Sequence, residues 1–600
     1  MTSWFGPSAD IDADLSDPPL LQDNSTFKSY KTSQFEYTNL RVFYRQHVKA
    51  DQLPAALPLL VCVPGLGGSV AQFHPLLNSL SDLAPCLAMD FPGGGRSKFS
   101  INSWDAYTTQ ALVELLETVI EDHRAPDQSV VLIGHSMGTA LCAWLASKSS
   151  PHKTKVADHV TGFVAICPVS SPIDEAKTTL IRRLMWVPGW VFALWRMWDG
   201  MGGPNSPSVA RFVGDAGDEE LKVLQYRYNQ QSRTPVWRRM VHGALPTYTD
   251  GKPSGGFPTC DIWAGLEIPV YLIAGESDHL TPPKEVETIV TAMKAAHKGE
   301  EAAAPTSVEI SLEAQHHISI DMQSNAVSSP DADGSPSEPL SPADAASTGV
   351  PPQPAHPQRA VQSTVMPAPA NHTLLYSHRS VRALAGLISD FLATHVTGRL
   401  SLAWQLQYLS REGKWDVKNL NKWKAVPPVS EPIGPSNGPP IFMVMKTLRE
   451  ADDVHCPRVF AQVHGELVKD VLDISKDQPV YDPRGLEREG IHYHKFATIS
   501  KVPPSHEEVE TFIGLVDKIR AAQAERAAAE GWETGKTFLV GVHCHYGFNR
   551  SGYFVVCYLV ERCGMSLEDA IATFGRMRPN GIRHSHFLDR LHVRYDLHSV

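Results

Sequence analysis

The chain has 600 residues, of which 42% are hydrophobic and 20% charged, and this composition excludes a collagen-like or wholly disordered chain. The length is too great for one ordinary hydrophobic core and predicts two domains. The formal net charge of -11 argues against a general binder of nucleic acids or anionic membranes, although it allows a local basic pocket.

The cysteines and the apolar segments bear on location. Nine cysteines without a CxxC pair indicate reduced thiols, so we expect a cytoplasmic or nuclear protein. The first 20 residues lack the basic and apolar regions of a signal peptide. The longest apolar segment, residues 184–198, is interrupted by Pro188, Gly189 and Arg196 and is too short to span a bilayer. We therefore expect a lid and no stable membrane insertion.

Residues 35–273 alternate short apolar runs with helical stretches. The runs "LLVCV", "CLAMD", "VVLIG", "GFVAIC" and "VYLIAG" are each followed by a turn that contains Gly, Pro or Ser. Continuous apolar runs of this kind are typical of strands buried on both faces of a parallel sheet. The pattern predicts an α/β fold with a doubly wound sheet, whose functional turns lie at the carboxyl ends of the strands.

The first domain is expected to cover residues 35–397, after a flexible N-terminal tail at residues 1–34. The sheet pattern stops between residues 171 and 268, where a helical, tryptophan-containing stretch predicts a cap. The run "SVEIS", residues 307–311, reads as the last strand, and the Ser, Pro, Ala and Asp-rich residues 323–370 predict a disordered insertion. The run "SVRALAGLISDFL" then predicts a final helix.

A connecting segment, residues 398–421, leads to a second α/β domain at residues 422–600. The runs "VKDVLDIS", "IHYHKFATI" and "KTFLVGVHC" predict strands. The runs "SHEEVETFIGLVDKIRAAQ", "SGYFVVCYLVERCG" and "SLEDAIATFGRM" predict helices. There is no internal repeat, so this domain is not a duplication of the first.

The stretch "IGHSMG", residues 133–138, indicates a serine nucleophile. Gly-x-Ser-x-Gly between a strand and a helix forms a cramped turn that exposes the serine hydroxyl, here Ser136. In the chain order Ser, Asp, His, the acid is Asp278 and the base is His372. His316 and His317 are the alternative bases, but His372 directly precedes the closing helix. The backbone N–H groups of Leu66 and Met137 are the expected oxyanion donors.

The motifs "PGLGGS", "DFPGGGRS", "GHSMG" and "GESDHLTP" together resemble the α/β-hydrolase family over residues 35–397. The resemblance implies an esterase, lipase, thioesterase or peptidase-like activity, with a small-molecule ester or a lipid as substrate. A serine at position 136 disfavours the epoxide hydrolases of this fold, which use an aspartate nucleophile. A hydrolase fold that serves only as a non-catalytic scaffold is the alternative.

The stretch "HCHYGFNRSG", residues 543–552, indicates a phosphate-binding loop around Cys544. A cysteine attacks phosphorus as a thiolate, which requires a lowered pKa and compensation of the phosphate charge. Arg550 supplies a bidentate guanidinium, and a helix that starts near Ser551 adds its positive end. His543 is expected to hold the loop. The expected phosphate-binding residues are His545, Tyr546, Gly547, Phe548, Asn549, Arg550 and Ser551.

The motif HCxxGxxR in this strand, loop and helix context resembles the cysteine-dependent protein-tyrosine and dual-specificity phosphatase superfamily. The further runs "FMVMKT", "VLDIS", "YDPRGLEREGIHYHKF" and "RPNGI" resemble the RNA 5′-triphosphatase domain of mRNA capping enzymes. No guanylyltransferase domain follows, so complete capping activity is not implied. The implied partner is a phosphorylated RNA or a phosphoprotein.

A phosphorylated RNA and a phosphoprotein differ in the group that leaves when the phosphoryl group is transferred. Protein phosphatases of this superfamily usually protonate the leaving oxygen with a loop aspartate, but the stretch "ATISKVPPSHEE" contains none. A tyrosine oxygen, with a pKa of about 10, needs such an acid more than a polyphosphate does. We therefore favour a phosphoanhydride such as an RNA 5′-triphosphate. Phosphotyrosine or phosphoserine is the alternative, and Glu507 and Glu508 are the candidate substitute acids.

The histidine pairs in "HYH" and "HSH" lack identifiable further ligands, so neither a metal nor a cofactor is expected. The arginines near the C-terminus are spaced among acidic residues and read equally well as a solvated helix face. The sequence leaves the oligomeric state open.

Overall fold

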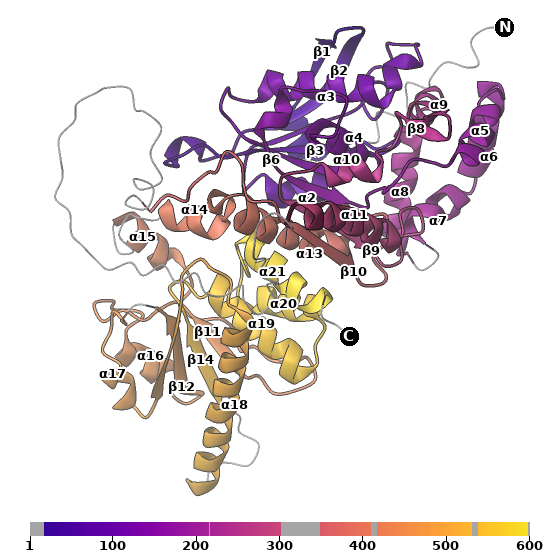
Figure 1. The fold of residues 1–600 in the computed structure, drawn as a ribbon. Coiled ribbons are helices and arrows are strands. Elements are labelled where there is room, and N and C mark those ends of the chain that lie inside the picture. The colour runs from indigo at the N-terminus through magenta and orange to yellow at the C-terminus, as the bar shows by residue number, and fades with distance from the viewer. Residues whose placement is uncertain are drawn as a thin grey trace, which may run out of the picture. The chain divides into compact units, whose positions relative to one another are not determined.

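The computed structural model describes residues 17–214, 217–301, 349–409, 417–476, 478–530 and 538–597. Contacts divide these residues into two units, the first reaching Leu402 and the second beginning at Ala403 (Figure 1). Within the described ranges, no helix is long and apolar enough to cross a membrane.

The first unit is built on an eight-stranded sheet with the order β1-β2-β4-β3-β5-β6-β9-β10. Strands β4 to β10 run parallel in this order, and β2 pairs antiparallel with both β1 and β4 at one edge. The strands are β1 Ser25–Lys31, β2 Glu36–Arg45, β3 Leu59–Val63, β4 Cys86–Met89, β5 Val130–His135, β6 Val160–Ile166, β9 Val270–Gly275 and β10 Val361–Met366.

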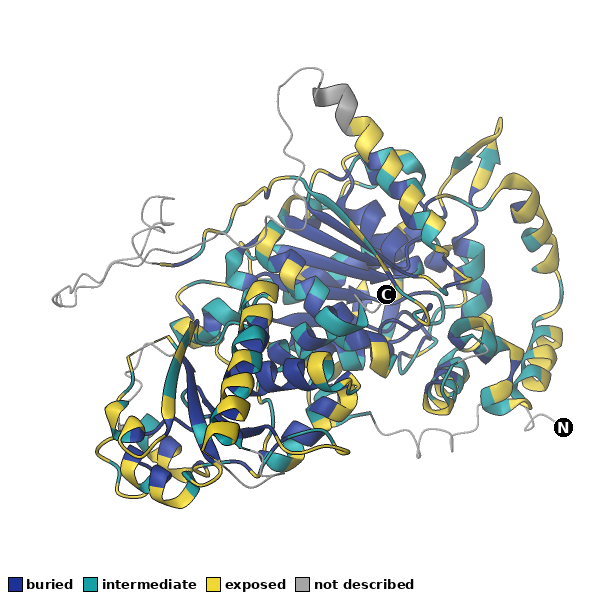
Figure 2. Ribbon diagram, turned by 90° about the horizontal axis from the view of Figure 1, so that it is seen from below, coloured by how far each residue is buried: buried dark blue, intermediate teal, exposed yellow. Residues whose placement is uncertain are grey.

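Helices cover both faces of this sheet. Figure 2 accordingly shows its inner strands as buried. Helix α2 packs on α13, whereas α3 and α10 pack on α4. The elements are α1 Pro19–Asp23, η2 Ala50–Gln52, α2 Val70–Leu80, η3 Asp105–Tyr107, α3 Thr109–His123, α4 Met137–Ala146, η4 Val156–His159, α10 Cys260–Ala264, α11 Pro283–Glu301, α13 His378–Phe391, the π-helical turn η7 Leu392–Val396 and η8 Gly398–Leu400. The doubly wound α/β sheet predicted from the apolar runs is thereby confirmed.

The residues between β6 and α10 form the helices expected of a cap. They are α5 Glu175–Leu184, α6 Gly189–Gly200, η5 Gly203–Asn205, α7 Pro207–Val213, α8 Glu219–Gln231 and α9 Thr234–Gly243. A short hairpin of β7 Thr247–Thr249 and β8 Lys252–Ser254 follows them. The predicted limits, 171 and 268, extend past the hairpin into α10, which packs on α4 beside the sheet.

Two expectations about the ends of the first domain are corrected by the structure. Residues 25–31, placed in a flexible tail, form β1 and pair with β2. Residues 361–366, placed in the disordered insertion, form β10 and pair with β9. Both are edge strands with few buried residues, so they lack the apolar runs that mark the inner strands. The expected strand "SVEIS" and the insertion up to residue 348 lie outside the described residues.

The second unit contains a four-stranded parallel sheet with the order β11-β14-β12-β13. Its strands are β11 Phe442–Met445, β12 Val468–Ser475, β13 His492–Thr498 and β14 Leu539–His543. Its helices are α15 Val417–Ala425, α16 Pro457–His464, α17 Arg484–Glu487, α18 His506–Ala529, α19 Asn549–Cys563, α20 Leu567–Met577 and α21 Ser585–Asp596, while α14 Leu402–Tyr408 spans the boundary. The predicted second α/β domain is confirmed, with residues 403–409 and 417–421 on its side of the boundary.

Candidate active sites

Ser136 lies in a strained turn between β5 and α4. Its backbone angles, φ 52° and ψ -123°, belong to a region that non-glycine residues rarely adopt. The flanking glycines allow this turn because it is crowded by backbone. A Cβ on Gly134 would lie 2.8 Å from the backbone of Thr139, and one on Gly138 would lie 2.1 Å from the carbonyl oxygen of Val63. The turn therefore has the geometry of a nucleophile elbow.

Asp278 and His372 meet although 94 residues separate them. His372 Nδ1 lies 2.8 Å from Asp278 Oδ2, and both side chains are almost fully buried. Asp278 Oδ1 also accepts hydrogen bonds from the backbone N–H groups of Leu280 and Thr281. Burial acts to raise the pKa of Asp278, but the hydrogen bonds from His372 and Thr281 outweigh it and lower that pKa to about 2. The carboxylate is thus ionised beside the imidazole.

The Thr281 hydroxyl contacts both Asp278 and His372. The sequence did not indicate a role for this residue. Its Oγ1 donates to Asp278 Oδ2 at 2.8 Å and lies 3.3 Å from His372 Nδ1. In the described residues, no hydrogen bond joins the Ser136 hydroxyl to His372. Such bonds are often long in free enzymes and tighten when substrate binds.

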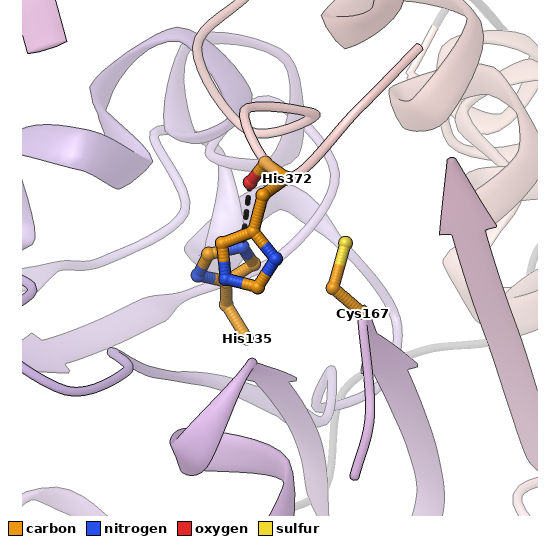
Figure 3. Close-up of side chains that lie close together, drawn as sticks. All are labelled: His135, Cys167 and His372. Carbon is orange, nitrogen blue, oxygen red and sulfur yellow. Dashed lines mark hydrogen bonds between the residues drawn. The ribbon is translucent and has the colours of Figure 1, made fainter. Parts of the chain in front are cut away.

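His135 and Cys167 lie close to His372 (Figure 3). His135 Nε2 lies 3.1 Å from the carbonyl oxygen of His372, and the two rings are 4.9 Å apart. Burial lowers the pKa of His135 to about 3. The nitrogen and sulfur atoms of the three residues lie within 4.8 Å of one another, a donor set that suits a soft metal ion. A metal ion bound there would have His372 as a ligand, although Asp278 already binds and orients that side chain.

The loop after β3 passes directly beside Ser136. A Cβ on Gly65 would lie 2.9 Å from the Cβ of Ser136. Leu66 therefore stands next to the nucleophile, and Met137, as the first residue of α4, has an N–H without an intrahelical acceptor. Leu66 and Gly67 also line a cavity of about 620 Å³ that the cap helices cover. Ser136 and His372 adjoin this cavity but do not line it.

In the second unit, Cys544 follows β14 at the carboxyl edge of the sheet. The residues paired with the end of β14 are Met445 and Asp473, so β11 and β12 flank the start of the loop. Burial acts to raise the pKa of the Cys544 thiol, but Arg550 and hydrogen bonds from Ser551 and the Gly547 backbone outweigh it, and the pKa lies below its ordinary value. The buried Ser551 hydroxyl has no further partner within the described part of the chain.

The carbonyl groups of the loop are tied down on its outer side. Arg578 donates to the carbonyl oxygens of Tyr546 and Gly547, and the N–H of Thr447 donates to that of His545. In a planar trans peptide, the C=O of one residue and the N–H of the next point in opposite directions. The N–H groups of residues 546, 547 and 548 therefore point away from Arg578 and Thr447, and the Gly547 N–H binds Cys544, an arrangement that suits an anion nest.

Arg550 is buried and oriented by the sheet. Its Nη1 donates to the carbonyl oxygens of Ile474 at 3.2 Å and Thr498 at 2.8 Å, and to Thr498 Oγ1 at 3.3 Å. Among the described contacts, Nε and Nη2 donate to no protein group. The guanidinium thus keeps one edge for a bidentate contact with two oxygens of a bound phosphate.

The remaining predicted loop residues have mainly structural contacts. His543, fully buried, lies 2.8 Å from the Tyr481 hydroxyl and 3.0 Å from the carbonyl oxygen of Cys544, so it fixes the loop as expected. Asn549 Oδ1 accepts from the backbone N–H groups of Arg583 and His584. Phe548 lies between two arginines, with the Arg583 guanidinium 3.9 Å and the Arg578 guanidinium 4.9 Å from its ring centre.

The two candidate substitute acids differ in their environment. Glu508 is the N3 residue of the capping box of α18, where it accepts from the backbone N–H of Ser505 at 2.8 Å and its own N–H binds the Ser505 hydroxyl. Glu507 is exposed in the first turn of the same helix. Glu508 therefore has a structural role, and only Glu507 is unconstrained by these contacts.

The comparisons with known proteins agree with the two sites. A model of the alpha/beta hydrolase fold matches residues 58–300, and a model of the dual specificity phosphatase catalytic domain matches residues 529–595. An abhydrolase domain-containing protein of Schizosaccharomyces pombe is 27% identical over 235 residues, which cover 38% of this chain and 59% of that protein.

Several relatives match the second unit, and two of them illustrate the range. The mRNA-capping enzyme of Mus musculus is 36% identical over 126 residues, which cover 21% of this chain and 19% of that enzyme. A tyrosine-protein phosphatase of Autographa californica nuclear polyhedrosis virus is 28% identical over 121 residues, which cover 20% of this chain and 65% of that protein. The chain thus spans about a fifth of the capping enzyme's length. It joins a domain of the α/β-hydrolase fold to a domain of the dual specificity phosphatase family.

Proposed function

We propose that the chain is a bifunctional hydrolase whose Cys544 site removes a phosphoryl group from an RNA 5′-triphosphate or a similar phosphoanhydride. The Cys544 thiolate attacks the terminal phosphorus, and the bond from phosphorus to the bridging oxygen breaks. The terminal phosphoryl group is then held as a cysteinyl-phosphate, which water hydrolyses to inorganic phosphate and free thiol. Arg550 and the inward N–H groups of the loop stabilise the charge on the transferring group.

The observation that carries this choice of substrate is the absence of Asp and Glu from residues 498–505, the stretch that follows β13. Between Thr498 and Ser505 there is no carboxylate, and Glu508 is engaged in its capping box. The leaving oxygen of a polyphosphate belongs to a phosphate group with a pKa of about 6, whereas a tyrosine oxygen has a pKa of about 10. A polyphosphate can leave without a proton donor, so this site suits it better.

Two exposed cations near the loop support the same choice. Lys422 Nζ lies 5.5 Å from the ring centre of Tyr546, and the exposed Arg583 stacks on Phe548. A triphosphate carries charge beyond the phosphoryl group that Arg550 would hold, and these cations stand where that charge can be met. A phosphotyrosine side chain has no such second phosphate.

A phosphoprotein is the second candidate substrate, because one relative of this unit is named a tyrosine-protein phosphatase. In that case Glu507 is the remaining candidate proton donor.

The thiol mechanism is tested by phosphate release from triphosphorylated RNA. Cys544→Ser and Arg550→Ala should each abolish release, whereas Cys563→Ser, which changes a half-buried cysteine at the end of α19, should retain it. Release by Cys544→Ser at the wild-type rate would refute the cysteinyl-phosphate.

For the first unit we propose a serine hydrolase of the esterase or lipase type. Ser136 Oγ attacks the ester carbonyl carbon while His372 accepts its proton, and the N–H groups of Leu66 and Met137 bind the oxyanion. Asp278, which already contacts His372 Nδ1, holds the imidazole in the tautomer that leaves Nε2 free to accept. The supporting observation is the strained turn at Ser136 together with the buried Asp278–His372 pair.

A fluorophosphonate probe tests this proposal. It should label the wild-type chain and fail to label Ser136→Ala, whereas Ser69→Ala, at the start of α2, should be labelled like the wild type. No labelling of a folded wild-type chain would favour a non-catalytic scaffold. We also propose a cytoplasmic or nuclear location, which is in keeping with free thiols at all nine cysteines.

A further inference from the structure

The cap carries large apolar side chains that face solvent. On α6, Trp190, Leu194 and Trp198 recur at intervals of four residues and share one side of the helix. Trp186, just before α6, is 88% exposed, and Met201, just after it, is 74% exposed. We call the exposed set the tryptophan face: Leu180, Leu184, Trp186, Trp190, Val191, Leu194, Trp195, Met197, Trp198 and Met201. Contiguous exposed apolar surface on a cytoplasmic domain usually marks an interaction site.

Helix α6 is amphipathic, but its apolar side faces solvent and its polar side faces the rest of the cap. A surface helix normally turns its apolar side to the core and its charged side to water. Here Arg196 points inward and donates to the carbonyl oxygen of Asn229 at 3.1 Å and to the Thr234 hydroxyl at 3.2 Å. Asp199 likewise accepts from the backbone N–H of Ser208. The polar side of α6 is thus bound by the cap, which holds the tryptophans outward.

The charge of the cap helices, from the start of α5 to the end of α9, differs from that of the whole chain. Residues 175–243 contain ten Lys and Arg against six Asp and Glu, although the chain has a formal net charge of -11. Arg183, beside Leu184 of the tryptophan face, is exposed, as are Arg211 and Arg233. Tryptophans interspersed with cations are typical of helices that lie in the interface of an anionic bilayer.

The tryptophan face and the cavity share side chains. Trp195 and Met197 belong to the face and also line the cavity of about 620 Å³. Leu66 and Gly67, beside Ser136, line the same cavity. Phe212, another lining residue, has its ring centre 5.6 Å from that of His372. The cavity, whose volume suits a drug-sized ligand, therefore extends from the face to residues that adjoin the serine site.

We propose that the tryptophan face docks on an anionic lipid bilayer, and that the substrate of the Ser136 site is a lipid ester that enters the cavity from that bilayer. The indole rings would sit among the lipid headgroups while α5 and α6 lie parallel to the surface. The identity of the substrate rests on the proposed serine hydrolase function. The docking does not depend on that function, so an experiment can refute the docking or the substrate separately.

Docking is tested with the full-length Ser136→Ala chain, which cannot consume the vesicle. It should sediment with phosphatidylcholine vesicles that contain phosphatidylglycerol, with a shift of tryptophan emission to shorter wavelength. Replacing Trp186, Trp190 and Trp198 by Ser should lower the binding constant by roughly tenfold or more, because their transfer from water is lost. Phe27→Ser, which removes an exposed aromatic ring from β1, is the matched control and should bind like the parent.

Equal vesicle binding by the parent and the triple variant would overturn the docking proposal. So would absence of vesicle binding combined with self-association that the triple variant loses, since the face would then be an interface between two copies. Arg183→Glu should weaken binding to the anionic vesicles and leave binding to pure phosphatidylcholine unchanged.

The substrate is tested with the wild-type chain, which keeps Ser136. Its rate of hydrolysis of a vesicle-embedded acyl ester is compared with its rate on a short soluble ester. The same three tryptophan replacements, made in the chain that keeps Ser136, should lower the ratio of the two rates roughly tenfold, in line with the loss of docking. An unchanged ratio would overturn delivery from the bilayer. If the wild-type chain binds vesicles but hydrolyses neither ester, the serine hydrolase proposal fails and the docking surface stands.

Discussion

Two side chains with ordinary intrinsic chemistry, Ser136 and Cys544, owe their proposed reactivity to their neighbours. The backbone of Ser136 adopts a rare conformation that a packed sheet edge maintains, and such strain costs about 1–3 kcal/mol. Cys544 is buried, which disfavours a thiolate, yet Arg550, Ser551 and the loop amides lower its pKa. In both cases, the fold favours a state that is rarer in the isolated residue.

The Ser551 hydroxyl offers a direct test of the thiolate. Because it lowers the pKa of Cys544, Ser551→Ala should raise that pKa and move the pH profile of iodoacetamide alkylation upward. The rate at neutral pH should fall, and the two proteins should react alike above the ordinary thiol pKa of about 8.5. Cys563, whose pKa is raised by burial, is an internal control that should react only at high pH in both proteins. An unshifted profile would contradict the assignment.

Asp278→Asn should inactivate the proposed serine site without unfolding the protein. The amide cannot balance an imidazolium, and it favours the wrong tautomer of His372, so ester turnover should fall by roughly 10⁴-fold. Asp250→Asn, in an exposed turn with a positive φ that Asn tolerates, is the control and should keep the wild-type rate. A loss of less than tenfold, measured as kcat on a p-nitrophenyl ester, would show that Asp278 has no such role.

The sequence pointed to the residues that we propose to react, but not to those that support them. Motif spacing selected Ser136, Asp278, Cys544 and Arg550 as candidates because each lies in or next to a recognisable turn, and His372 was selected by its place before the closing helix. Arg578 shows what was missed: it is fully buried and binds two loop carbonyl oxygens, yet in the sequence it is one of several arginines in a mixed-charge stretch. Only the packing of the end of α20 against the loop distinguishes it.

At the scale of elements, strand order decides where the reactive turns lie. Parallel strands β3, β5 and β6 bring the turn at Gly65 and the turn at Ser136 to one sheet edge, and β9 adds Asp278. The inner strands were predictable from their apolar runs. Strands β1 and β10 were not, because an edge strand with one exposed face shows no such run, and its partner is known only from the fold.

The contact between α4 and β3 predicts a large effect of one methyl group. In Gly138→Ala the new Cβ would lie 2.1 Å from the carbonyl oxygen of Val63, so β3 or α4 must shift. We expect the free energy of unfolding to fall by about 2 kcal/mol or more. Gly514→Ala, in the interior of α18 with nothing within 4 Å, should instead raise it by roughly 0.5–1 kcal/mol. Denaturant titration of both variants checks the contrast, and equal effects would contradict the packing argument.

At the scale of the whole molecule, each unit has its own core and its own site. The core of the first unit includes residues of β3, β5 and β9, and that of the second includes residues of β12, β14 and α19. Domains with separate cores usually unfold separately. Calorimetry should therefore show two transitions, and Gly138→Ala should lower only one of them. A single transition that shifts as a whole would contradict this independence.

The most direct test of the central claim compares two substrates at the Cys544 site. Inorganic phosphate released from RNA with a 5′-triphosphate should exceed that released from a phosphotyrosine peptide at equal concentration, and Cys544→Ser should abolish both. Ser136→Ala should change neither rate. Faster release from the phosphopeptide, or release from the RNA that survives Cys544→Ser, would contradict the account of a thiolate loop that acts on phosphoanhydrides.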